Sequence, residues 1–469
     1  MSGDVDYSKL PCVVWVNIMK YLSLNDRYQL SVTNRYLYEY FSHPSLWSKA
    51  YIKMIGGYTN FHICSTLMSD KCVKLIQTFG HLFQNLHIQI DGHFGQMEEQ
   101  HKLLLQSLAK NCRLQVLTLE VGLMISRFHL EGNLPENEDL ASILLLVQNA
   151  TRLKELNIIS WPMYPALLQN PSYNIFQVMK NNDKIKSLES LNLFWMKECS
   201  WSERHPILPS AKFTEKIVHN FKNLKRLSLR SPMLSEELII ELITPGRAKL
   251  DVLQIFITYS AHHEQYQMPH ISGESWDVLK SVHPTLEVDC TIMSRIGEDV
   301  LGILLKPEVP LKSLTILRHS KCGSELLLPI ADKFHNNLKS FICHCDASGV
   351  DEPLVQLVAS CSLLTELVFY GEIYVTTLMK LAEFRGKAWK KFVFVEKSIK
   401  TEFDEDGDDD DDVVLKQDSH GSYQLKSLHR FHREDEERDT KIDNLNKWIS
   451  EVIGFPWRPL AAIDSENQS

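Results

Sequence analysis

One short pattern, apolar-x-x-apolar-x-apolar, returns eleven times between residues 83 and 394. Successive copies begin 25 to 39 residues apart, and the later copies approach a constant period. The last two apolar residues of a copy alternate, which is typical of a strand with one buried face. The copies are Phe83/Leu86/Ile88, Leu114/Leu117/Leu119, Leu153/Leu156/Ile158, Leu188/Leu191/Leu193, Leu224/Leu227/Leu229, Leu250/Leu253/Ile255, a degenerate Leu286/Val288, Leu311/Leu314/Ile316, Leu338/Phe341/Cys343, Leu364/Leu367/Phe369 and Trp389/Phe392/Phe394.

Many copies follow a stretch of helical spacing, as at Leu140–Val147, Phe213–Phe221 and Leu354–Cys361. A helix-then-strand unit of this length is typical of leucine-rich repeats, in which each unit buries its apolar face only against its neighbours. A doubly wound α/β domain is expected to have a glycine-rich phosphate loop after its first strand, and the sequence has none. We therefore predict an α/β chain in which three N-terminal helices precede an irregular leucine-rich-repeat solenoid, with parallel strands on the concave face and helices outside.

The N-terminal fifty residues form a separate helical block. Leu10-Pro11 predicts a helix start, because proline at a first helical turn gives up a hydrogen bond that this position lacks anyway. Val14, Trp15, Ile18, Met19 and Leu22 then follow at helical spacing, and Ser23, Asn25 and Asp26 are capping residues that can begin a second helix. A unit of about 40 residues does not easily bury such a stripe by itself, so it is expected to dock.

In order and spacing this block resembles an F-box over residues 8–50. The most specific parts are Leu10-Pro11-x-x-Val14 at its start and Pro44-x-Leu46-Trp47 at its end. Cys12 and Tyr36 depart from the family, which commonly has glutamate and tryptophan there. The resemblance implies docking to the S-phase-kinase-associated adaptor of cullin–RING (SCF-type) ubiquitin ligases.

The expected adaptor contacts are apolar: Leu10, Pro11, Val14, Ile18, Leu22, Leu24, Leu30 and Val32. Three aromatic residues, Trp15, Tyr36 and Trp47, are expected to be buried instead, to hold the F-box together and to fix it to the first repeat. Taken whole, the chain resembles F-box-only proteins with a divergent repeat domain, and most closely the group of F-box only proteins 33 and 39. The stretches behind that narrower resemblance include Trp276–Leu279, Glu298–Leu304, Asp351–Val355 and Leu381–Gly386.

Charge and composition narrow the function further. The net charge is −9, but nine acidic residues and no basic one lie between Glu402 and Asp412, so the remainder is neutral. No broad basic face therefore indicates nucleic acid, and no run approaches the ~18 apolar residues of a membrane span. The N-terminus is acidic and polar rather than a secretory signal, so the ten cysteines are expected to be reduced thiols of an intracellular protein, cytoplasmic or nuclear.

We predict no catalytic residue, cofactor or metal site. The sequence has no nucleophile elbow, Walker loop or H-E-x-x-H motif, and no paired cysteine/histidine blocks of the RING type. Cys343-His344-Cys345, with Cys322 earlier, is the one dense Cys/His cluster. A zinc site commonly uses two pairs of ligands, and a single C-x-C on a strand supplies one, so buried core cysteines are the expected interpretation.

Residues that alternate with the buried leucines are expected to line the concave strand face. Arginine and aromatic residues are over-represented at binding hot spots, so the predicted substrate surface consists of Phe194, Arg226, Arg230, Phe256 and Tyr370. A non-enzymatic receptor that presents a protein substrate for ubiquitination is the leading hypothesis. A scaffold that uses the same surfaces without degradation is the alternative.

The expected organisation has five parts: an F-box at 8–50, repeats at 51–400, an acidic disordered insertion at 401–420, a C-terminal capping segment at 421–460 and a disordered tail at 461–469.

Overall fold

The computed structural model describes residues 10–55, 58–60, 69–93, 99–111, 113–124, 138–162, 173–194, 208–258, 269–293, 302–318, 320–345, 347–400 and 443–460. The chain forms two compact units, the first being Met1–Ile255 with Val278–Leu286 and the second Phe256–Asp277 with Glu287–Ser469. The predicted acidic insertion and tail lie outside the described residues.

The first unit opens with four short helices: α1 (Cys12–Tyr21), α2 (Leu24–Ser31), α3 (Arg35–Phe41) and α4 (Pro44–Trp47). Side chains at the helix starts explain these boundaries. Ser23 accepts a hydrogen bond from the backbone N–H of Asp26, and Asn34 accepts one from Tyr36. Pro11 lies one residue before α1 as its N-cap. The predicted helix start and the Ser23 cap are therefore confirmed.

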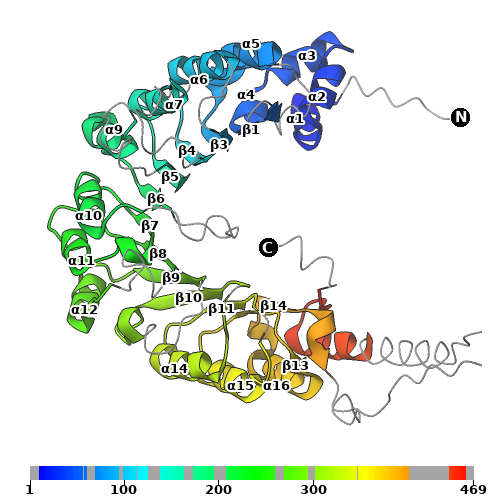
Figure 1. Ribbon diagram of the computed structural model, residues 1–469. Coiled ribbons are helices and arrows are strands. Elements are labelled where there is room, and N and C mark those ends of the chain that lie inside the picture. The colour runs from blue at the N-terminus through cyan, green and yellow to red at the C-terminus, as the bar shows by residue number, and fades with distance from the viewer. Residues whose placement is uncertain are drawn as a thin grey trace, which may run out of the picture. The chain divides into compact units, whose positions relative to one another are not determined.

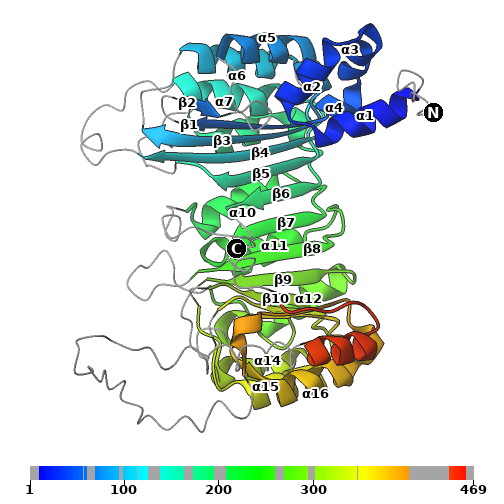
Figure 2. The same ribbon diagram turned by 90° about the vertical axis from the view of Figure 1, so that its right-hand side faces the viewer.

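A sheet with the strand order β7-β6-β5-β4-β3-β1-β2 follows in the first unit (Figures 1 and 2). Its neighbouring strands are parallel except for the antiparallel pair β1–β2. The strands are β1 (Lys49–Ile55), β2 (Tyr58–Asn60), β3 (Asn85–His93), β4 (Val116–Met124), β5 (Glu155–Ser160), β6 (Ser190–Leu193) and β7 (Arg226–Arg230).

Helices lie on one face of this sheet, and α5, α6, α7 and α9 can be followed side by side along it (Figure 1). The helices are α5 (Ser69–Phe79), α6 (Glu99–Asn111), α7 (Glu138–Asn149), α9 (Ile175–Asn181), α10 (Ala211–His219) and α11 (Glu236–Leu242), with short 3₁₀ turns η2 (Gly80–Leu82), η4 (Asp183–Ile185) and η6 (Ser231–Met233). Strand β8 (Val252–Ile257) and helix α12 (Gly273–Val282) each contain a boundary between the two units.

The second unit repeats this architecture. Its parallel sheet has the order β14-β12-β11-β10-β9, with α14, α15 and α16 on one face (Figure 1). Its elements are β9 (Glu287–Ile292), β10 (Leu311–Ile316), α14 (Ser324–Phe334), β11 (Ser340–Cys343), α15 (Asp351–Ser360), β12 (Glu366–Phe369), β13 (Ile373–Tyr374), α16 (Val375–Arg385), η8 (Gly386–Ala388), β14 (Lys391–Phe394), η9 (Glu396–Ser398) and β15 (Ile399–Lys400). Strands β13 and β15 form a small parallel sheet of their own.

All eleven copies of the apolar pattern coincide with a strand, and every residue of the pattern is at most 5% exposed. The same backbone hydrogen bond recurs between successive repeats, just before their strands. The N–H groups of Gln115, Lys154 and Glu189 donate to the carbonyls of Gln84, Gln115 and Lys154 at 2.8 Å each, and Lys390 donates to Thr365 at 2.8 Å. The predicted repeat fold is therefore confirmed: within each compact unit, strand-and-helix repeats stack on one another and share that unit's core.

Strand β1 was not predicted, and neither were the short strands β2, β13 and β15. Trp47, Ala50 and Ile52 fit the same apolar spacing, and all three are buried around β1. Trp47 belongs to both patterns, since it closes the helical block and begins the first repeat. Its Nε1 donates to the Phe41 carbonyl at 2.7 Å, and its ring stacks on Phe79 of α5 with a centroid separation of 4.2 Å. The N-terminal helices and the first repeat are thus packed on one aromatic cluster.

Residues 443–460 pack against the last strand of the second unit. A helix over 443–453 places Leu445, Ile449 and Ile453 in the core. Trp457 is buried, and its Nε1 donates to the Phe392 carbonyl at 2.8 Å. Leu460 pairs with Val395, and its N–H donates to Phe394. This segment covers the free edge of β14.

Candidate functional site

Helix α1 has an inward side and an outward side. Val16 and Met19 are buried, whereas Val13, Val14 and Ile18 are exposed. Tyr21, at the end of the helix, is 91% exposed. The predicted single stripe is thus divided, because Met19 faces the other helices while Val14 and Ile18 face outward. A contiguous row of exposed apolar side chains on a small helix indicates a docking surface.

The neighbouring helices extend this outward surface. Tyr28 and Val32 near the end of α2, and Tyr36 and Tyr38 in α3, are each more than half exposed. We call the outward side chains of α1, α2 and α3 the N-terminal apolar surface. Its members are Val13, Val14, Ile18, Tyr21, Tyr28, Val32, Tyr36 and Tyr38.

Most of the predicted adaptor contacts are accessible. Pro11, Val14, Ile18 and Val32 are exposed, and Leu10, Leu22 and Leu30 are partly exposed. Leu24 is the exception. It is 3% exposed, so its side chain is already covered by the chain and is not available to a partner.

The three aromatic residues expected to hold the F-box together have different environments. Trp47 is buried as predicted, and Trp15 is half-buried. The prediction for Tyr36 is wrong, because its side chain is 60% exposed in the first turn of α3. Phe41, at the end of that helix, does the packing instead: it meets Trp47 and Phe79 edge to face at 5.1 and 5.7 Å.

Arg27 of α2 is hydrogen-bonded to the C-terminal end of α1 and to the Leu46 carbonyl of α4. Its Nε donates to the Leu22 carbonyl at 2.9 Å, and its Nη2 donates to the Lys20 carbonyl at 3.2 Å, so it satisfies the C-terminal end of α1. Burial lowers the pKa of Arg27. A cavity of about 500 Å³ beside it is lined by residues of α1, α2, α4 and β1. Arg27 therefore holds the helices that present the apolar surface in a fixed arrangement.

A second candidate surface lies on the face of the first unit's sheet opposite its helices, which we call the strand face. Tyr51, His87, Thr118 and Asn157 are register partners on β1, β3, β4 and β5. The His87 and Tyr51 rings meet edge to face at 4.7 Å, and the Asn157 Nδ2 donates to the Thr118 Oγ1 at 3.2 Å. A polar row therefore crosses four strands.

Glu120, two residues beyond Thr118 on β4 and the register partner of Gln89, is a charged residue beside this row. Its Oε1 accepts a hydrogen bond from the Gln89 Nε2 at 3.2 Å, and its Oε2 lies 3.3 Å from the His87 Nε2. The Glu120 side chain is 23% exposed, so it remains accessible. Sequence reasoning missed this network because it searched for arginine and aromatic residues rather than for a polar row in register.

The predicted substrate residues are mostly not on a surface. Arg226 is exposed, but Phe194, Arg230, Phe256 and Tyr370 are buried. The prediction is wrong for these four residues, which lie among the last two residues of a strand or directly after it, where buried and outward side chains no longer alternate. Phe194 follows β6 with a φ of 62°, a backbone conformation rare for residues other than glycine, and its ring lies 6.4 Å from that of Phe176 in α9.

The other three misplaced residues follow the same logic. Arg230 is the last residue of β7, and its Nε donates to the Phe194 carbonyl at 2.8 Å. Phe256 lies near the end of β8, where three consecutive residues are buried. Tyr370 follows β12 and packs with Val368 and Val395.

The strand face of the second unit is apolar at its last strands. Val368, Tyr370 and Val395 form a buried cluster, with Ile342, Val393 and Leu460 packed against it. Ile342, Val368 and Val393 are register partners on β11, β12 and β14. Burial raises the pKa of Tyr370, whose ring meets His344 edge to face at 4.7 Å. We call this the second-unit apolar cluster.

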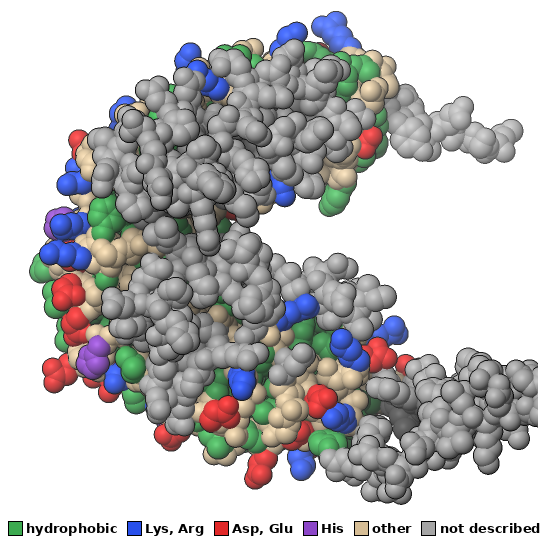
Figure 3. Space-filling view, in the orientation of Figure 1, with side chains coloured by type: hydrophobic (Ala, Val, Ile, Leu, Met, Phe, Trp, Pro, Cys, Tyr) green, Lys and Arg blue, Asp and Glu red, His purple; other side chains and the backbone are tan. Residues whose placement is uncertain are grey.

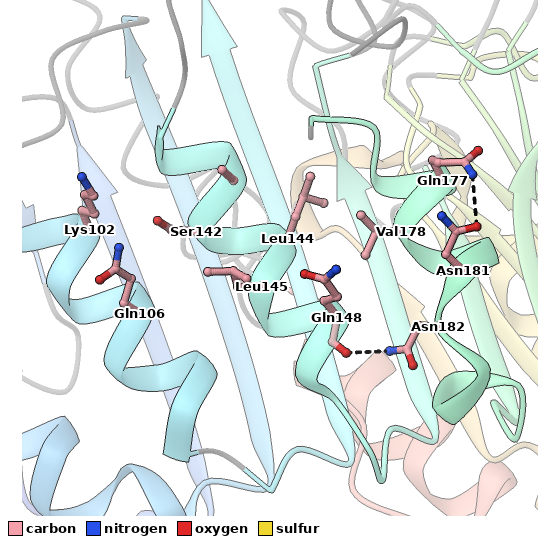
Figure 4. Close-up of a pocket in the computed structure, with 11 residues that line it drawn as sticks. Lys102, Gln106, Ser142, Leu144, Leu145, Gln148, Gln177, Val178, Asn181 and Asn182 are labelled. Carbon is pink, nitrogen blue, oxygen red and sulfur yellow. Dashed lines mark hydrogen bonds between the residues drawn. The ribbon is translucent and has the colours of Figure 1, made fainter. Parts of the chain in front are cut away.

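A groove of about 610 Å³ lies between α6, α7 and α9 (Figure 4). Its walls are mostly amide and apolar side chains, including Gln106, Leu145 and Gln148. Asn182 at one end donates to the carbonyls of Val147 and Gln148 at 2.7 and 3.1 Å. That amide joins the end of α7 to the end of α9. We therefore interpret the groove as a result of helix packing rather than as a catalytic site.

Charge is evenly mixed on the helical side of the second unit. Basic and acidic side chains are interspersed over α14, α15 and α16 in the space-filling view (Figure 3). Among the described helices, none is both long and apolar enough to cross a membrane.

Comparisons with known proteins agree with this architecture. A family model described as F-box-like matches residues 7–53. F-box/LRR-repeat protein 21 of Mus musculus is 23% identical over 367 residues, which is 78% of this chain and 77% of that protein. The chain joins an F-box-like domain to a leucine-rich-repeat region. This agrees with the predicted F-box, and the match to F-box only proteins 33 and 39 is not among these findings.

A likeness to a solved structure is weaker. The structure titled "Crystal structure of TLR13-ssRNA13 complex" is 15% identical, covers 67% of this chain and 49% of that chain, and has a TM-score of 0.26. This likeness does not bear on the function of this protein.

Proposed function

We propose that this protein is a substrate-recognition subunit of an SCF-type (cullin–RING) ubiquitin ligase. The F-box-like domain docks the S-phase-kinase-associated adaptor, and the repeat region holds a protein substrate. The observation that carries the proposal is the N-terminal apolar surface, because exposed apolar side chains on α1–α3 coincide with the F-box-like match at residues 7–53. The narrower resemblance to F-box only proteins 33 and 39 and an intracellular location, cytoplasmic or nuclear, stay predictions.

Adaptor binding would be mainly hydrophobic. Val14 and Ile18 are one helical turn apart on the outward side of α1, and Leu10 and Pro11 precede them at the same end of the domain. Burial of apolar area contributes roughly 25 cal/mol per Å², so a few such side chains supply much of the binding free energy. We retain Leu10, Pro11, Val14, Ile18, Leu22, Leu30 and Val32 as the proposed contacts, and we omit the buried Leu24.

The contribution to ubiquitin transfer would be proximity. A receptor that holds a substrate beside a catalytic partner raises the effective concentration of the acceptor lysine and needs no active site of its own. The polar row of the first unit is the proposed substrate surface. Glu120, His87 and Gln89 are already held by one another there, so little conformational entropy would be lost when a partner binds.

Adaptor docking is tested with Val14→Asp combined with Ile18→Asp in the full chain. We expect recovery of the adaptor in co-purification to fall by more than about 30-fold, because a charge at each hot-spot position leaves the apolar partner surface uncovered. Ile240→Asp in α11 is the matched control, since Ile240 is also an exposed isoleucine on a helix (54%).

The milder pair Leu10→Ala with Pro11→Ala should weaken recovery without unfolding the repeats. Unchanged adaptor recovery from both double variants, with wild-type circular dichroism, would exclude the proposed docking. Stable levels of every captured protein after cullin inhibition would favour the scaffold without degradation instead.

A further inference from the structure

Three cysteines from two successive repeats meet in the core of the second unit. Cys322 lies in the loop between β10 and α14, Cys343 ends β11, and Cys345 follows two residues later. Their Sγ atoms all lie within 4.8 Å of one another, and the sulfurs of Cys343 and Cys345 are 3.3 Å apart. The side chains are 6%, 0% and 0% exposed.

These separations match the span of a metal ion. Sulfur–metal bonds to zinc are about 2.3 Å, so three thiolates around one such ion lie roughly 3.8 to 4.0 Å apart. The Cys343–Cys345 separation is 3.3 Å, and no pair of the three sulfurs is more than 4.8 Å apart. Small changes in side-chain torsion angles would bring the three sulfurs to equal distances from one point.

Core packing alone does not account for the cluster. In the other complete copies of the repeat, leucine, isoleucine or phenylalanine fills the position of Cys343. Cysteine is smaller, and three of them in contact gather weak S–H donors where apolar side chains would fill the volume. Cys290 and Cys361 are buried in the same unit and show the ordinary arrangement, since neither joins the group.

The donor set selects the class of ion. Among the described residues, no histidine, aspartate or glutamate belongs to this group, so the ligands are sulfur only. Soft thiolate ligands select soft closed-shell ions, of which Cu⁺ and Zn²⁺ are the biological examples, over Mg²⁺, Ca²⁺ and Mn²⁺. We propose that Cys322, Cys343 and Cys345 form a three-thiolate site for one soft metal ion of this class.

Binding would exchange protons for the metal and change no oxidation state. Each thiol that is still protonated gives its proton to solvent and forms one sulfur–metal bond. The bound ion would join the loop after β10 to the end of β11, and thus two neighbouring repeats.

The test uses the full chain, reduced and under nitrogen, loaded separately with Zn²⁺ and with Cu⁺ and then desalted. We expect one equivalent of at least one of these ions to remain by elemental analysis. Cys322→Ser and Cys345→Ser should weaken its binding by more than about 100-fold, which exceeds the loss typical of an outer-sphere partner. Cys290→Ser and Cys361→Ser are matched controls that should retain the ion.

X-ray absorption on the loaded wild-type protein keeps the test independent of variant folding. Three sulfurs at about 2.3 Å are expected. Retention of neither ion, a first shell dominated by nitrogen or oxygen, or equal loss in the control variants would overturn the proposal. The arm that retains metal identifies which ion the site prefers.

Discussion

The two units present different chemistry on the same kind of strand face. In the first unit, register partners Thr118 and Asn157 are polar and hydrogen-bonded to each other. In the second unit, register partners Ile342, Val368 and Val393 are apolar and belong to one cluster. Side chains that point into the core must be apolar in both units, because stacking depends on them. The opposite face is free to differ, so one fold carries two surfaces.

The largest loss of stability is expected at the C-terminal end of the second unit. Trp457→Ala removes a buried indole and its hydrogen bond to the Phe392 carbonyl, and should destabilise the second unit by about 4 kcal/mol. Urea unfolding followed by circular dichroism measures this loss. Arg458→Ala, at the exposed neighbour, is the control. A loss below about 1 kcal/mol, the level of a surface change, would mean that residues 443–460 do not stabilise the apolar unit.

A reciprocal exchange of similar side chains tests the comparison directly. Val368→Thr keeps the shape but buries a hydroxyl within the second-unit apolar cluster, at a cost of about 2 kcal/mol. The same unfolding measurement applies. A stability equal to that of the wild type would show that this part of the strand face is wet rather than apolar.

Low pH should destabilise the first unit. His283 is buried, accepts a hydrogen bond from the Leu250 N–H at its Nδ1 and lies 3.2 Å from the Leu242 carbonyl through its Nε2, so the neutral ring is required. Burial lowers the pKa of His283. Below the ordinary histidine pKa the unfolded chain therefore binds more protons than the folded chain, and stability falls as the pH falls.

The expected loss is at most about 1.4 kcal/mol per pH unit. Unfolding at about pH 7.5 and pH 5.5 measures it. His283→Asn keeps a donor and an acceptor but does not titrate, so the part of the pH dependence due to His283 should vanish in that variant. A pH dependence that the variant leaves intact would assign it to other groups.

Thr118→Val, the second substitution of the reciprocal exchange, should have the smallest effect on stability. Thr118→Val removes the acceptor of one Asn157 hydrogen bond, but Asn157 still donates to the Glu155 Oε1 at 2.9 Å. We expect a loss of about 0.5 kcal/mol, because a partly exposed amide can also bond to water. A loss as large as that of Val368→Thr would remove the distinction between the two faces.

Much of the repeat fold could be predicted from the sequence, since each copy of the pattern is local. Leu156 and Ile158 are two residues apart, and strand alternation places both in the core whatever the rest of the chain does. The strand at β1 was missed because Ala50 is a weak apolar signal and Trp47 was assigned to the F-box alone. Of the N-terminal apolar surface, the sequence predicted Val14, Ile18 and Val32, and it wrongly placed the buried Leu24 among the outward contacts.

The candidate recognition surface could be predicted only in outline. Alternation correctly placed Asn157 opposite the buried leucines, and it failed at Phe194, where the chain leaves the strand with a positive φ. Local periodicity carries no information about such a turn. The polar row around Glu120 also depends on register between strands that are more than 30 residues apart in the sequence.

By itself, then, the sequence determined the repeats, the helical block before them and some of the exposed apolar side chains of that block, because these follow from spacing within a few residues. Only the tertiary structure decided which outward positions are open and which distant side chains meet. Cys322 and Cys343 belong to different repeats, and the spacing of cysteines indicated no metal site. Stacking one repeat on the next brings their sulfurs together, because neighbouring repeats of the second unit share a core.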